Sequence, residues 1–388
     1  MSYPTSAYIH LPFCRRRCYY CDFAISVVGD KPLKSDSTVV SDYVEHLNKE
    51  IQLSAVRREP LKTVFFGGGT PSLLPVVRLK EILQTIDRCF GIATDAEISL
   101  EIDPGTFDGE RLKQYLDVGI NRFSLGVQTF ESELLKLCGR THSVGDIYNA
   151  VELINQAGIK NYSLDLMTGL PQQTISDCEQ SLKQAIAIAP AHLSCYDLVL
   201  EPVTAFGKLY EPGETPLPTN EATAEMYRLT QKMLSDGGYQ HYEISNYALP
   251  GYQCHHNLVY WRNQEYYGFG MSAASYVENV RYTRPRTRKA YYEWVKQGAT
   301  TDEDPLTQND RLLETLMLGL RLAEGVDLAA VEKEHRKETI PQIANCLQPY
   351  IKQNLAAFSD RYLKLQDPEG FLLSNTILAT LFEKLGND

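Results

Sequence analysis

The sequence predicts an α/β protein built from parallel strands that alternate with helices. Six short apolar runs have the length and the flanking turn signals of buried strands. The stretches between them place apolar residues at every third or fourth position, which is the spacing of a helix with one buried face. Such alternation produces parallel strands joined by crossover helices. Six units form either an open, doubly wound sheet or an incomplete barrel, since a closed (β/α)8 barrel needs two more.

Each predicted strand is an apolar run bounded by turn residues. The six strands are expected at 7–13, 62–68, 97–104, 121–128, 161–169 and 192–200. The helices are expected at 39–56 and at about 75–90, 108–118, 143–157, 174–189 and 219–237. The first helix has one apolar face because five residues recur at helical spacing, namely Val40, Tyr43, Val44, Leu47 and Ile51.

Polar or glycine residues follow the predicted end of every strand. They are Cys14, Gly67 to Thr70, Glu101, Gln128, Asp165 and Glu201. Because ligands of parallel sheets and barrels bind at the carboxyl ends of the strands, these residues predict one shared site. Taken singly, each would also suit an ordinary strand–helix turn, and Glu101 and Asp165 would each suit a helix cap.

The pattern changes after residue 240, and three segments are expected. Residues 1–240 carry the strand–helix units, and residues 241–305 form an extension rich in Tyr, Asn, Gly and Arg. Residues 306–388 are expected to form a mostly helical C-terminal domain. Its last part predicts a strand, a Pro-Glu-Gly turn, a second strand and a helix, which is the pattern of a winged-helix-like domain.

Composition and charge argue against several classes of protein. The chain of 388 residues has a net charge of −11, which argues against nucleic-acid binding as its main role. It has no apolar run of about 18 residues, so no integral membrane segment is expected. Its N-terminus lacks the basic and apolar regions of a secretion signal. Nine cysteines in such a chain predict reduced thiols or metal ligands and a cytoplasmic location.

Three cysteines lie close together directly after the first predicted strand. Cys14, Cys18 and Cys21 have the spacing C-x3-C-x2-C, and no fourth cysteine follows closely. Thiolates select zinc, copper(I) or iron–sulfur clusters. A structural zinc site needs four ligands, for which His10 in the predicted strand is a candidate. Three cysteines can instead hold three irons of a [4Fe–4S] cluster and leave the fourth iron open to a substrate or cofactor. Free thiols are the remaining interpretation.

The cysteine spacing and the segment FFGGGTPS at 65–72 resemble the radical S-adenosylmethionine (SAM) superfamily. More specifically, the chain resembles the family of oxygen-independent coproporphyrinogen III oxidases over nearly its whole length. The matching segments are YIHLPFC, GGGTP, LEIDPGT, RFSLGVQTF, GRTH, NYSLDLMTGLPQQT, LEPVTAF, HHNLVYW, GFGMSAASY and LMLGLRLAEGVDL. The resemblance implies a partial (β/α)6 radical-SAM barrel, a [4Fe–4S] cluster, SAM and a C-terminal helical domain.

Two features resemble a particular branch of that family. The oxidases themselves have a fourth cysteine two residues after the third, where this chain has Phe23. The segment His256-Asn257-x-x-Tyr260-Trp261 resembles the HemW branch, whose members are regarded as haem chaperones. The resemblance therefore implies haem or a porphyrin as cargo and haem-accepting client proteins as partners. It leaves open the oxidase reaction, which is the radical SAM decarboxylation of coproporphyrinogen III to protoporphyrinogen IX.

The resemblance also implies roles for individual residues. Cys14, Cys18 and Cys21 would ligate the cluster. The residues at SAM-contacting positions are Tyr8, Gly67, Gly68, Gly69, Thr70, Glu101, Gln128, Arg140, Asp165 and Ala274. The glycines are expected to let the backbone approach the amino-acid end of SAM, because they have no Cβ. The residues expected at haem are His256, Asn257, Tyr260 and Trp261, which offer an imidazole ligand and flat aromatic surfaces. The alternative is that His256 belongs to a packed aromatic loop.

Two basic clusters are further binding candidates. Arg15, Arg16 and Arg17 lie within the cysteine loop, where they would offset the charge of the cluster. They would also attract an acidic electron donor such as a flavodoxin or ferredoxin. The second cluster is Arg281, Arg284, Arg286, Arg288 and Lys289, which would pair with haem propionates or with a partner protein. Both clusters are also consistent with ordinary solvated loops.

Overall fold

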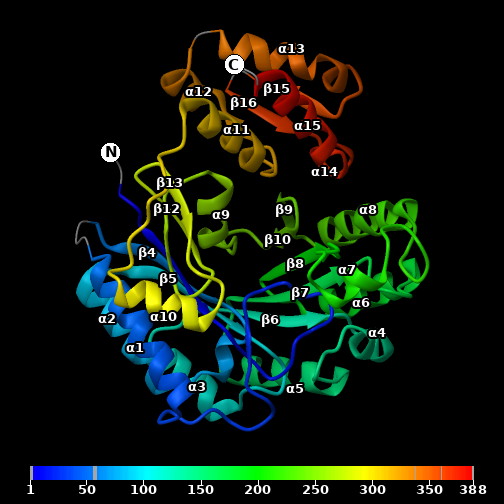
Figure 1. The fold of residues 1–388 in the computed structure, drawn as a ribbon. Helices are drawn as coiled ribbons and strands as arrows, with labels where there is room; N and C mark the ends of the chain where they lie inside the picture. Colours follow the sequence, from blue (N-terminus) through cyan, green and yellow to red (C-terminus); the bar gives the residue numbers. More distant parts are fainter. Residues whose placement is uncertain (1–2, 56–58, 337, 360, 387–388) are drawn as a thin grey trace.

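The centre of the molecule is a curved sheet of mainly parallel strands, with helices along its outer side (Figure 1). The computed structural model describes residues 3–55, 59–336, 338–359 and 361–386. Within these residues the main sheet has nine strands in the order β11-β1-β4-β5-β6-β7-β8-β10-β9. The two end strands do not pair with each other, so this part of the chain forms an open, partial barrel.

Six of the strands are those that the sequence predicts, and neighbouring ones pair in parallel. They are β1 (Ser6–Leu11), β4 (Leu61–Gly68), β5 (Ile92–Ile102), β6 (Arg122–Gln128), β7 (Tyr162–Thr168) and β8 (His192–Asp197). Their apolar side chains form one continuous core with those of the surrounding helices. The predicted partial (β/α)6 barrel is confirmed.

Three further strands extend this barrel at its edges. β11 (Tyr267–Phe269) pairs in parallel with β1, while β10 (Asn246–Ala248) and β9 (Gln240–Glu243) continue antiparallel beyond β8. They come from residues 240–269, where the sequence predicts no strand. Runs of three or four residues are too short to show a clear alternation, so their pairing depends on strands that are distant in sequence.

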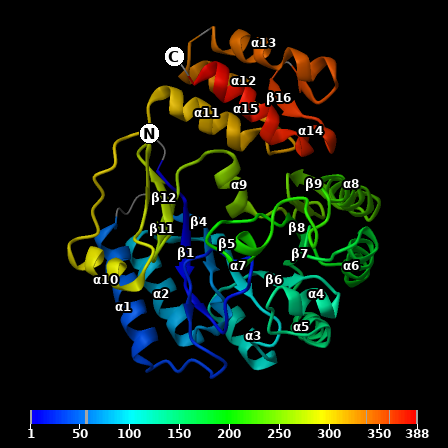
Figure 2. The same ribbon diagram turned by 45° about the vertical axis from the view of Figure 1, so that its right-hand side comes forward.

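The helices that connect the strands begin at recognisable signals. They are α1 (Thr38–Leu53), α2 (Val76–Cys89), α3 (Gly109–Asp117), α4 (Ser132–Leu137), α5 (Val144–Gln156), α6 (Ile175–Ile188), α7 (Ala205–Leu209) and α8 (Asn220–Asp236). Both α5 and α6 start with a capping box, formed by Ser143 with Asp146 and by Thr174 with Asp177. These helices cover the outer side of the sheet (Figure 2). The inner side is therefore left for the polar residues that line a cavity.

The extension after the barrel folds back against its first helix. It contains α9 (His255–Trp261), the hairpin β12 (Ala274–Val277) with β13 (Val280–Thr283), and α10 (Arg288–Lys296). Arg284 Nε lies 2.7 Å from Glu50 Oε1, and neither side chain is more than 1% exposed. The Tyr291 hydroxyl and the Gly270 N–H donate to the second Glu50 oxygen at 2.6 and 2.8 Å. A single carboxylate of α1 therefore holds three parts of the extension.

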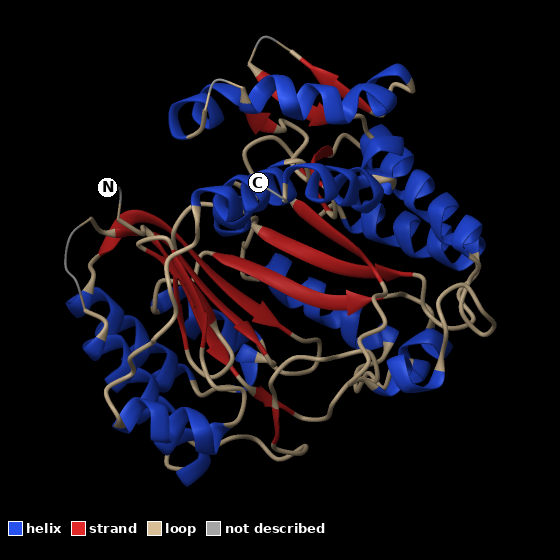
Figure 3. Ribbon diagram, turned by 45° about the horizontal axis from the view of Figure 1, so that its top comes forward, coloured by secondary structure: helices blue, strands red, loops and turns tan. Residues whose placement is uncertain are grey.

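The C-terminal part of the chain forms a separate layer over the barrel (Figure 3). Its elements are α11 (Gln308–Gly319), β14 (Val326–Asp327), α12 (Leu328–Glu334), α13 (Thr339–Lys352), β15 (Ala356–Phe358), β16 (Tyr362–Leu365), α14 (Glu369–Leu372) and α15 (Ser374–Leu385). They enclose a core of their own around a small antiparallel sheet. The mostly helical character of this part is confirmed. No helix in the described ranges combines the length and apolar character needed to cross a membrane.

One detail of the predicted tail is wrong. The strand expected after the Pro-Glu-Gly turn is the short helix α14, and β16 pairs with the preceding strand β15 instead. Pro368 stands just before the first helical residue, where its fixed φ and its missing N–H are tolerated. Phe371 then enters the C-terminal core from a helix.

Candidate functional site

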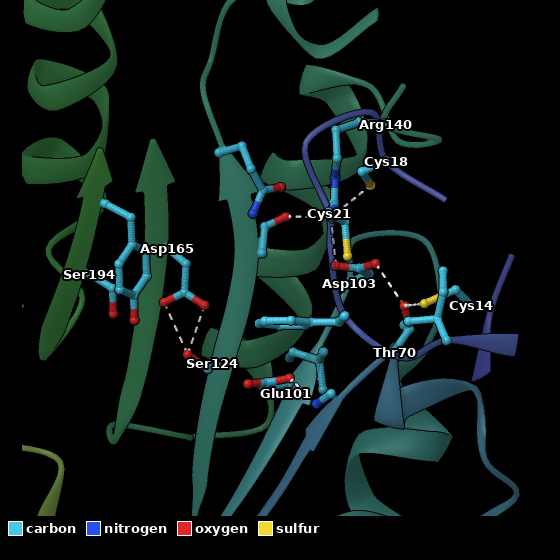
Figure 4. Close-up of a pocket in the computed structure, with 18 of the residues that line it drawn as sticks. Cys14, Cys18, Cys21, Thr70, Glu101, Asp103, Ser124, Arg140, Asp165 and Ser194 are labelled. Carbon is cyan, nitrogen blue, oxygen red and sulfur yellow. Dashed lines mark hydrogen bonds and ion pairs between the residues drawn. The ribbon is translucent and has the colours of Figure 1, made fainter. Parts of the chain in front are cut away.

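A cavity of about 500 Å³ lies inside the barrel and reaches the carboxyl ends of its strands (Figure 4). Its wall contains the three loop cysteines and most of the residues predicted to contact SAM. These are Cys14, Cys18, Cys21, Tyr8, Gly68, Gly69, Thr70, Glu101, Gln128, Arg140 and Asp165. Gly67, Ala274 and Glu201 are not in the wall, although Gly67 packs directly behind Tyr8 and Glu101. The folded chain thus gathers the ends of five separate strands around one space.

The cysteine loop is held in shape by backbone hydrogen bonds and by one arginine. Two short strands, β2 (Phe13–Cys14) and β3 (Ser26–Val27), pair at its base. Arg17 Nη1 donates to the carbonyl oxygens of Cys21 and Phe23 at 3.1 and 3.0 Å. These contacts close the loop on itself, so its three sulfur atoms are carried by a preformed segment.

The three thiols have different neighbours. Thr70 Oγ1 donates to Cys14 Sγ at 3.7 Å, and Arg140 Nη1 donates to Cys18 Sγ at 3.6 Å. Burial raises the pKa of Cys14 to about 12 and also raises the pKa of Cys21. Such thiols become ligands when the positive charge of a metal replaces the proton. No His, Cys, Asp and Glu side chains in the described ranges form a group of three that could hold a single metal ion.

The donor set suits an iron–sulfur cluster. Three cysteine sulfurs on one loop, with no fourth cysteine nearby in sequence, can each take one iron of a [4Fe–4S] cluster. Arg140 adds a cation beside one sulfur, which would offset part of the negative charge of the thiolates. The three cysteines that would hold the cluster line the same cavity as most of the predicted SAM residues.

Two carboxylates face the interior of the cavity from neighbouring parts of the sheet. Glu101 Oε2 accepts the Gly68 N–H at 3.0 Å. Burial, together with the nearby charge of Asp165, raises the pKa of Glu101 to about 8. Burial also raises the pKa of Asp165, although hydroxyl groups of Ser124 and Ser163 donate to it at 2.8 and 3.0 Å. The cavity can therefore offer one carboxyl that is protonated near neutral pH and one that is surrounded by donors.

Gln128 has an unused acceptor. Its amide Oε1 is buried and has no hydrogen-bond partner among the described residues. The residue itself has a φ of +65° and lies at a register shift between β6 and β7. A bulge of this kind redirects a side chain, here into the cavity wall. A ligand with a hydrogen-bond donor would satisfy this oxygen, as a SAM hydroxyl or amino group could.

Asp103 is a functional residue that sequence reasoning missed. Its carboxylate pairs with Arg140 Nη2 at 2.6 Å and accepts from Thr70 Oγ1 at 3.2 Å. Through these contacts it connects the donor of Cys14 with the donor of Cys18 (Figure 4). The signal was present, because Asp103 follows Glu101 by two residues and so lies on the same side of an extended strand.

The deeper wall also contains residues that sequence reasoning missed. Along β6, every second residue lines the cavity, namely Arg122, Ser124, Gly126 and Gln128. The alternation of polar and apolar residues in NRFSLGVQ carries this information, since a strand directs alternate side chains to one face. Ser194 and Tyr196 continue the pattern on β8.

The glycines at the end of β4 have a packing role. A Cβ at Gly69 would lie 2.7 Å from the Pro12 carbonyl carbon, and a Cβ at Gly68 would lie 2.5 Å from the His10 ring. Gly68 also has a φ of +109°, which other residues rarely adopt. The glycines thus let the end of β4 approach β1 and the start of the cysteine loop. Their predicted role in backbone approach to SAM stays a prediction.

His256 is a buried residue with both ring nitrogens engaged. Nδ1 lies 2.7 Å from Thr63 Oγ1, and Nε2 lies 2.8 Å from the Tyr260 hydroxyl. The ring stacks on Phe65 with 5.2 Å between centroids. Burial lowers the pKa of His256 to about 3, so the imidazole is neutral. In this structure His256 is part of the packing that closes the cavity, and haem ligation through either ring nitrogen would require that nitrogen to leave its present partner.

The other predicted haem residues divide between two environments. Asn257 and Tyr260 line the cavity with His256. Trp261 lies outside the cavity, packs in a cluster with Tyr242 and Leu258, and has the Arg321 guanidinium 5.9 Å from its ring centroid. The structure therefore brings Asn257 and Tyr260 to the cluster cavity and places Trp261 against the C-terminal layer.

The two predicted basic clusters differ in the exposure of their arginines and in the carboxylates with which these arginines pair. In the cysteine loop, Arg16 pairs with Asp30 at 3.2 Å, and both side chains are 65% exposed. In the second cluster, Arg284 is buried against Glu50, and Arg281 pairs with Glu314 of α11 at 2.8 Å. These two arginines join separate parts of the fold, so the reading of this cluster as a solvated loop is wrong for them. Propionates would have to displace their present partners.

Two family models match the chain. The model of the radical SAM superfamily matches residues 8–185, and the model of the HemN C-terminal domain matches residues 306–373. The first match contains the three cysteines, and the second covers most of the C-terminal layer.

Curated proteins match over nearly the full length. The haem chaperone HemW of Synechocystis sp. is 48% identical, with 99% of this chain and 98% of that protein covered. The haem chaperone HemW of Bacillus subtilis is 34% identical, with 98% and 100% covered. Among solved structures, the coproporphyrinogen III oxidase HemN of Escherichia coli superposes with a TM-score of 0.82 at 23% identity, covering 97% of this chain and 90% of that one. The structural likeness shows a shared fold.

Proposed function

Since the chain belongs to the HemW family of the radical SAM superfamily, we propose that it is a haem chaperone, which binds haem and delivers it to client proteins. The observation that supports this most directly is the near full-length relationship to proteins that carry this name. Phe23 adds to it, because the oxidases that the chain resembles have a cysteine at that position. Phe23 is 54% exposed at the cavity and offers no thiol.

The protein would carry two cofactors besides its cargo. Cys14, Cys18 and Cys21 would each ligate one iron of a [4Fe–4S] cluster. A cluster that binds SAM supplies one-electron radical chemistry when it is present. Holding and releasing haem does not itself require SAM cleavage.

The chain's own residues would position SAM. Arg140, held by Asp103, would direct its guanidinium toward the carboxylate of SAM beside the cluster. Gln128 Oε1 and Asp165 would accept hydrogen bonds from its amino or hydroxyl groups, and Glu101 would do so when ionised. The aromatic residues of α9 close the inner end of the cavity, which keeps water away from the reacting groups.

The partners follow from the same proposal. Haem or a porphyrin would be the cargo, and haem-dependent proteins would be the clients. Arg15 and Arg16 on the surface of the cysteine loop would meet an acidic electron donor such as a flavodoxin or ferredoxin. All nine cysteines of the chain are free thiols, which supports a reducing, cytoplasmic compartment.

The test is made on one anaerobic preparation with a reconstituted cluster. Titration with ferric haem should reach one haem per chain, and the haem should pass to an apo-haem protein that is added afterwards. In parallel, the preparation is incubated with SAM, a reductant and coproporphyrinogen III, and no vinyl-bearing product is expected. If the protein takes up no haem while its cluster is intact, the proposal is refuted. Conversion of coproporphyrinogen III would indicate the oxidase reaction instead.

A further inference from the structure

The cluster cavity has exposed apolar side chains at its outer end, which we call the mouth. Phe23 of the cysteine loop is 54% exposed, Tyr196 near the end of β8 is 42% exposed, and both line the cavity. Ile25 and Met167, which are partly exposed, belong to the same lining. Single exposed apolar residues are common on protein surfaces, but several that share one cavity indicate a binding site. We call these four residues the apolar rim.

The cysteine loop adds positive charge beside the apolar rim. Arg15 and Arg16 line the same cavity. Arg15 donates to the carbonyl oxygen of Gly105 at 3.0 Å, and Arg17 donates to carbonyl oxygens of its own loop. A carbonyl oxygen has no net charge, so these bonds leave the charge of both arginines available. The ion pair of Arg16 with Asp30 is exposed to solvent on both sides, and such surface pairs are weak.

The lining of the cavity has no excess of negative charge. Its charged residues are four arginines and three carboxylates, namely Arg15, Arg16, Arg122, Arg140, Glu101, Asp103 and Asp165. Burial raises the pKa of Glu101 to about 8, so this group is largely uncharged near neutral pH, and Asp103 is paired with Arg140. Next to Phe23, the Asp22 carboxylate lies 3.7 Å from the Arg286 guanidinium. An anionic ligand at the mouth would therefore meet arginines together with carboxylates that already have cationic partners.

We infer that haem lies across the mouth of the cluster cavity, with its ring against the apolar rim and its propionates paired with Arg15 and Arg16. This rests on the proposed haem chaperone function and specifies where the cargo lies. Haem is a flat, largely apolar ring with two carboxylates on one edge, so it requires an aromatic surface beside cations. The chain supplies that surface with Phe23, at the position where the oxidases that it resembles have a cysteine.

The contents of the cavity favour the mouth over the interior. The cavity of about 500 Å³ is lined by most of the predicted SAM residues, and a molecule of that size would fill it. At its inner end the His256 ring is held by Thr63 and Tyr260. A ring at the mouth keeps one edge exposed, where a client protein can reach it. The same arginines are proposed to meet an electron donor, so haem and that donor would occupy this surface in turn.

The experiment compares ferric haem with its dimethyl ester, in which both propionates are blocked, on the full-length protein with an intact cluster. The parent chain should bind the ester about tenfold more weakly, because two charge-assisted pairs are lost. The double variant Arg15→Gln with Arg16→Gln should bind haem about tenfold more weakly than the parent chain does. It should also bind haem and the ester within about threefold of each other. A general effect on folding would not remove this discrimination.

Phe23 is tested separately from the arginines. Phe23→Ala should weaken the binding of haem and of the ester by about tenfold each, because the ring loses its aromatic contact. The conservative variant Phe23→Tyr should bind haem as the parent chain does. Val77→Ala and Arg88→Gln are matched controls, because both residues are exposed on α2 and should leave haem binding unchanged. Iron and acid-labile sulfide are measured for every variant, so a lost cluster is not mistaken for a lost haem site.

The outcomes separate this inference from the function on which it rests. If the parent chain takes up haem and the double variant and Phe23→Ala bind it equally well, the mouth is not the site and the chaperone function stands. Equal affinities of the parent chain for haem and for its dimethyl ester would also overturn the inference, since the propionates would then have no partner. If the parent chain takes up no haem, the proposed function is lost together with the site.

Discussion

Replacing Arg284 by methionine should lower the free energy of unfolding by about 3–5 kcal/mol, the usual range for breaking a buried ion pair from one side. The side chain is 1% exposed, and its partner Glu50 is fully buried. Methionine fills much of the space but removes the charged partner of Glu50, whose remaining donors among the described residues are the Tyr291 hydroxyl and the Gly270 N–H. The lost guanidinium also bonds to Ser275 Oγ at 2.5 Å, so the hairpin loses a second contact.

Urea unfolding followed by tryptophan fluorescence would measure this change. The chain has two tryptophans, and Trp294 lies with its ring centroid 5.8 Å from the Arg284 guanidinium, so its emission reports on this region. With an m-value of about 3 kcal/mol/M, the loss corresponds to a midpoint shift of about 1–2 M. Arg361→Ala is the matched surface control: its ion pair with Asp327 is 64% and 29% exposed and should contribute at most about 1 kcal/mol.

A double variant tests the physical reason. Glu50→Gln combined with Arg284→Met removes both charges, so no unpaired buried charge remains, and much of the lost stability should return. If the free energy of unfolding of the single variant Arg284→Met lies within about 1 kcal/mol of that of the parent chain, the reasoning is refuted. Such a result would mean that the buried Glu50 carboxylate does not need the arginine charge.

Three further predictions concern the site. Cys18→Ser should lose most of its iron and acid-labile sulfide after reconstitution, and metal analysis showing parent-level iron would contradict the assignment. Glu101→Gln should flatten the dependence of unfolding free energy on pH. Burial raises the pKa of Glu101 to about 8 from an ordinary 4.5, so the stability that its protonation contributes is full below about pH 4.5 and is lost as pH rises to about 8. Urea midpoints of the cluster-free protein at several pH values check this, and equal slopes for both chains would speak against it. His256→Gln should lower the free energy of unfolding by about 1–3 kcal/mol through its lost contacts with Thr63 and Tyr260. Urea unfolding measures this change, and parent-level stability of the variant would contradict the packing role of His256.

Local sequence patterns were sufficient for the six parallel strands, because each is a run of apolar residues with turn residues on both sides. The same holds for the cysteine loop, because the C-x3-C-x2-C spacing alone favours a [4Fe–4S] cluster over a zinc site. The alternation along β6 carried the same kind of signal for Arg122, Ser124 and Gly126, but only Gln128 of this strand was predicted as a site residue. Short-range rules work in these places because neighbouring residues in the chain remain neighbours in space.

The strands β9, β10 and β11 could not be predicted, because three or four residues carry little pattern of their own and gain stability only from distant partners. Arg281 and Arg284 were also consistent with a solvated basic loop. In the structure they pair with Glu314 and Glu50, which are distant from them in the sequence. A run of basic residues in the sequence does not identify the carboxylates with which those residues pair in the folded protein.

The two histidines at 255 and 256 show most clearly what only the tertiary structure decided. The sequence by itself determined that an imidazole-bearing motif follows the barrel and that the chain has the cysteines of a radical SAM protein. It did not determine which ring is free. Adjacent residues on a helix point about 100° apart. One imidazole is therefore enclosed by Thr63, Phe65 and Tyr260, while the side chain of the other is 68% exposed. That difference arises because the packing of α9 against β4 and β5 fixes the rotation of the helix, and no pattern within seven residues specifies it.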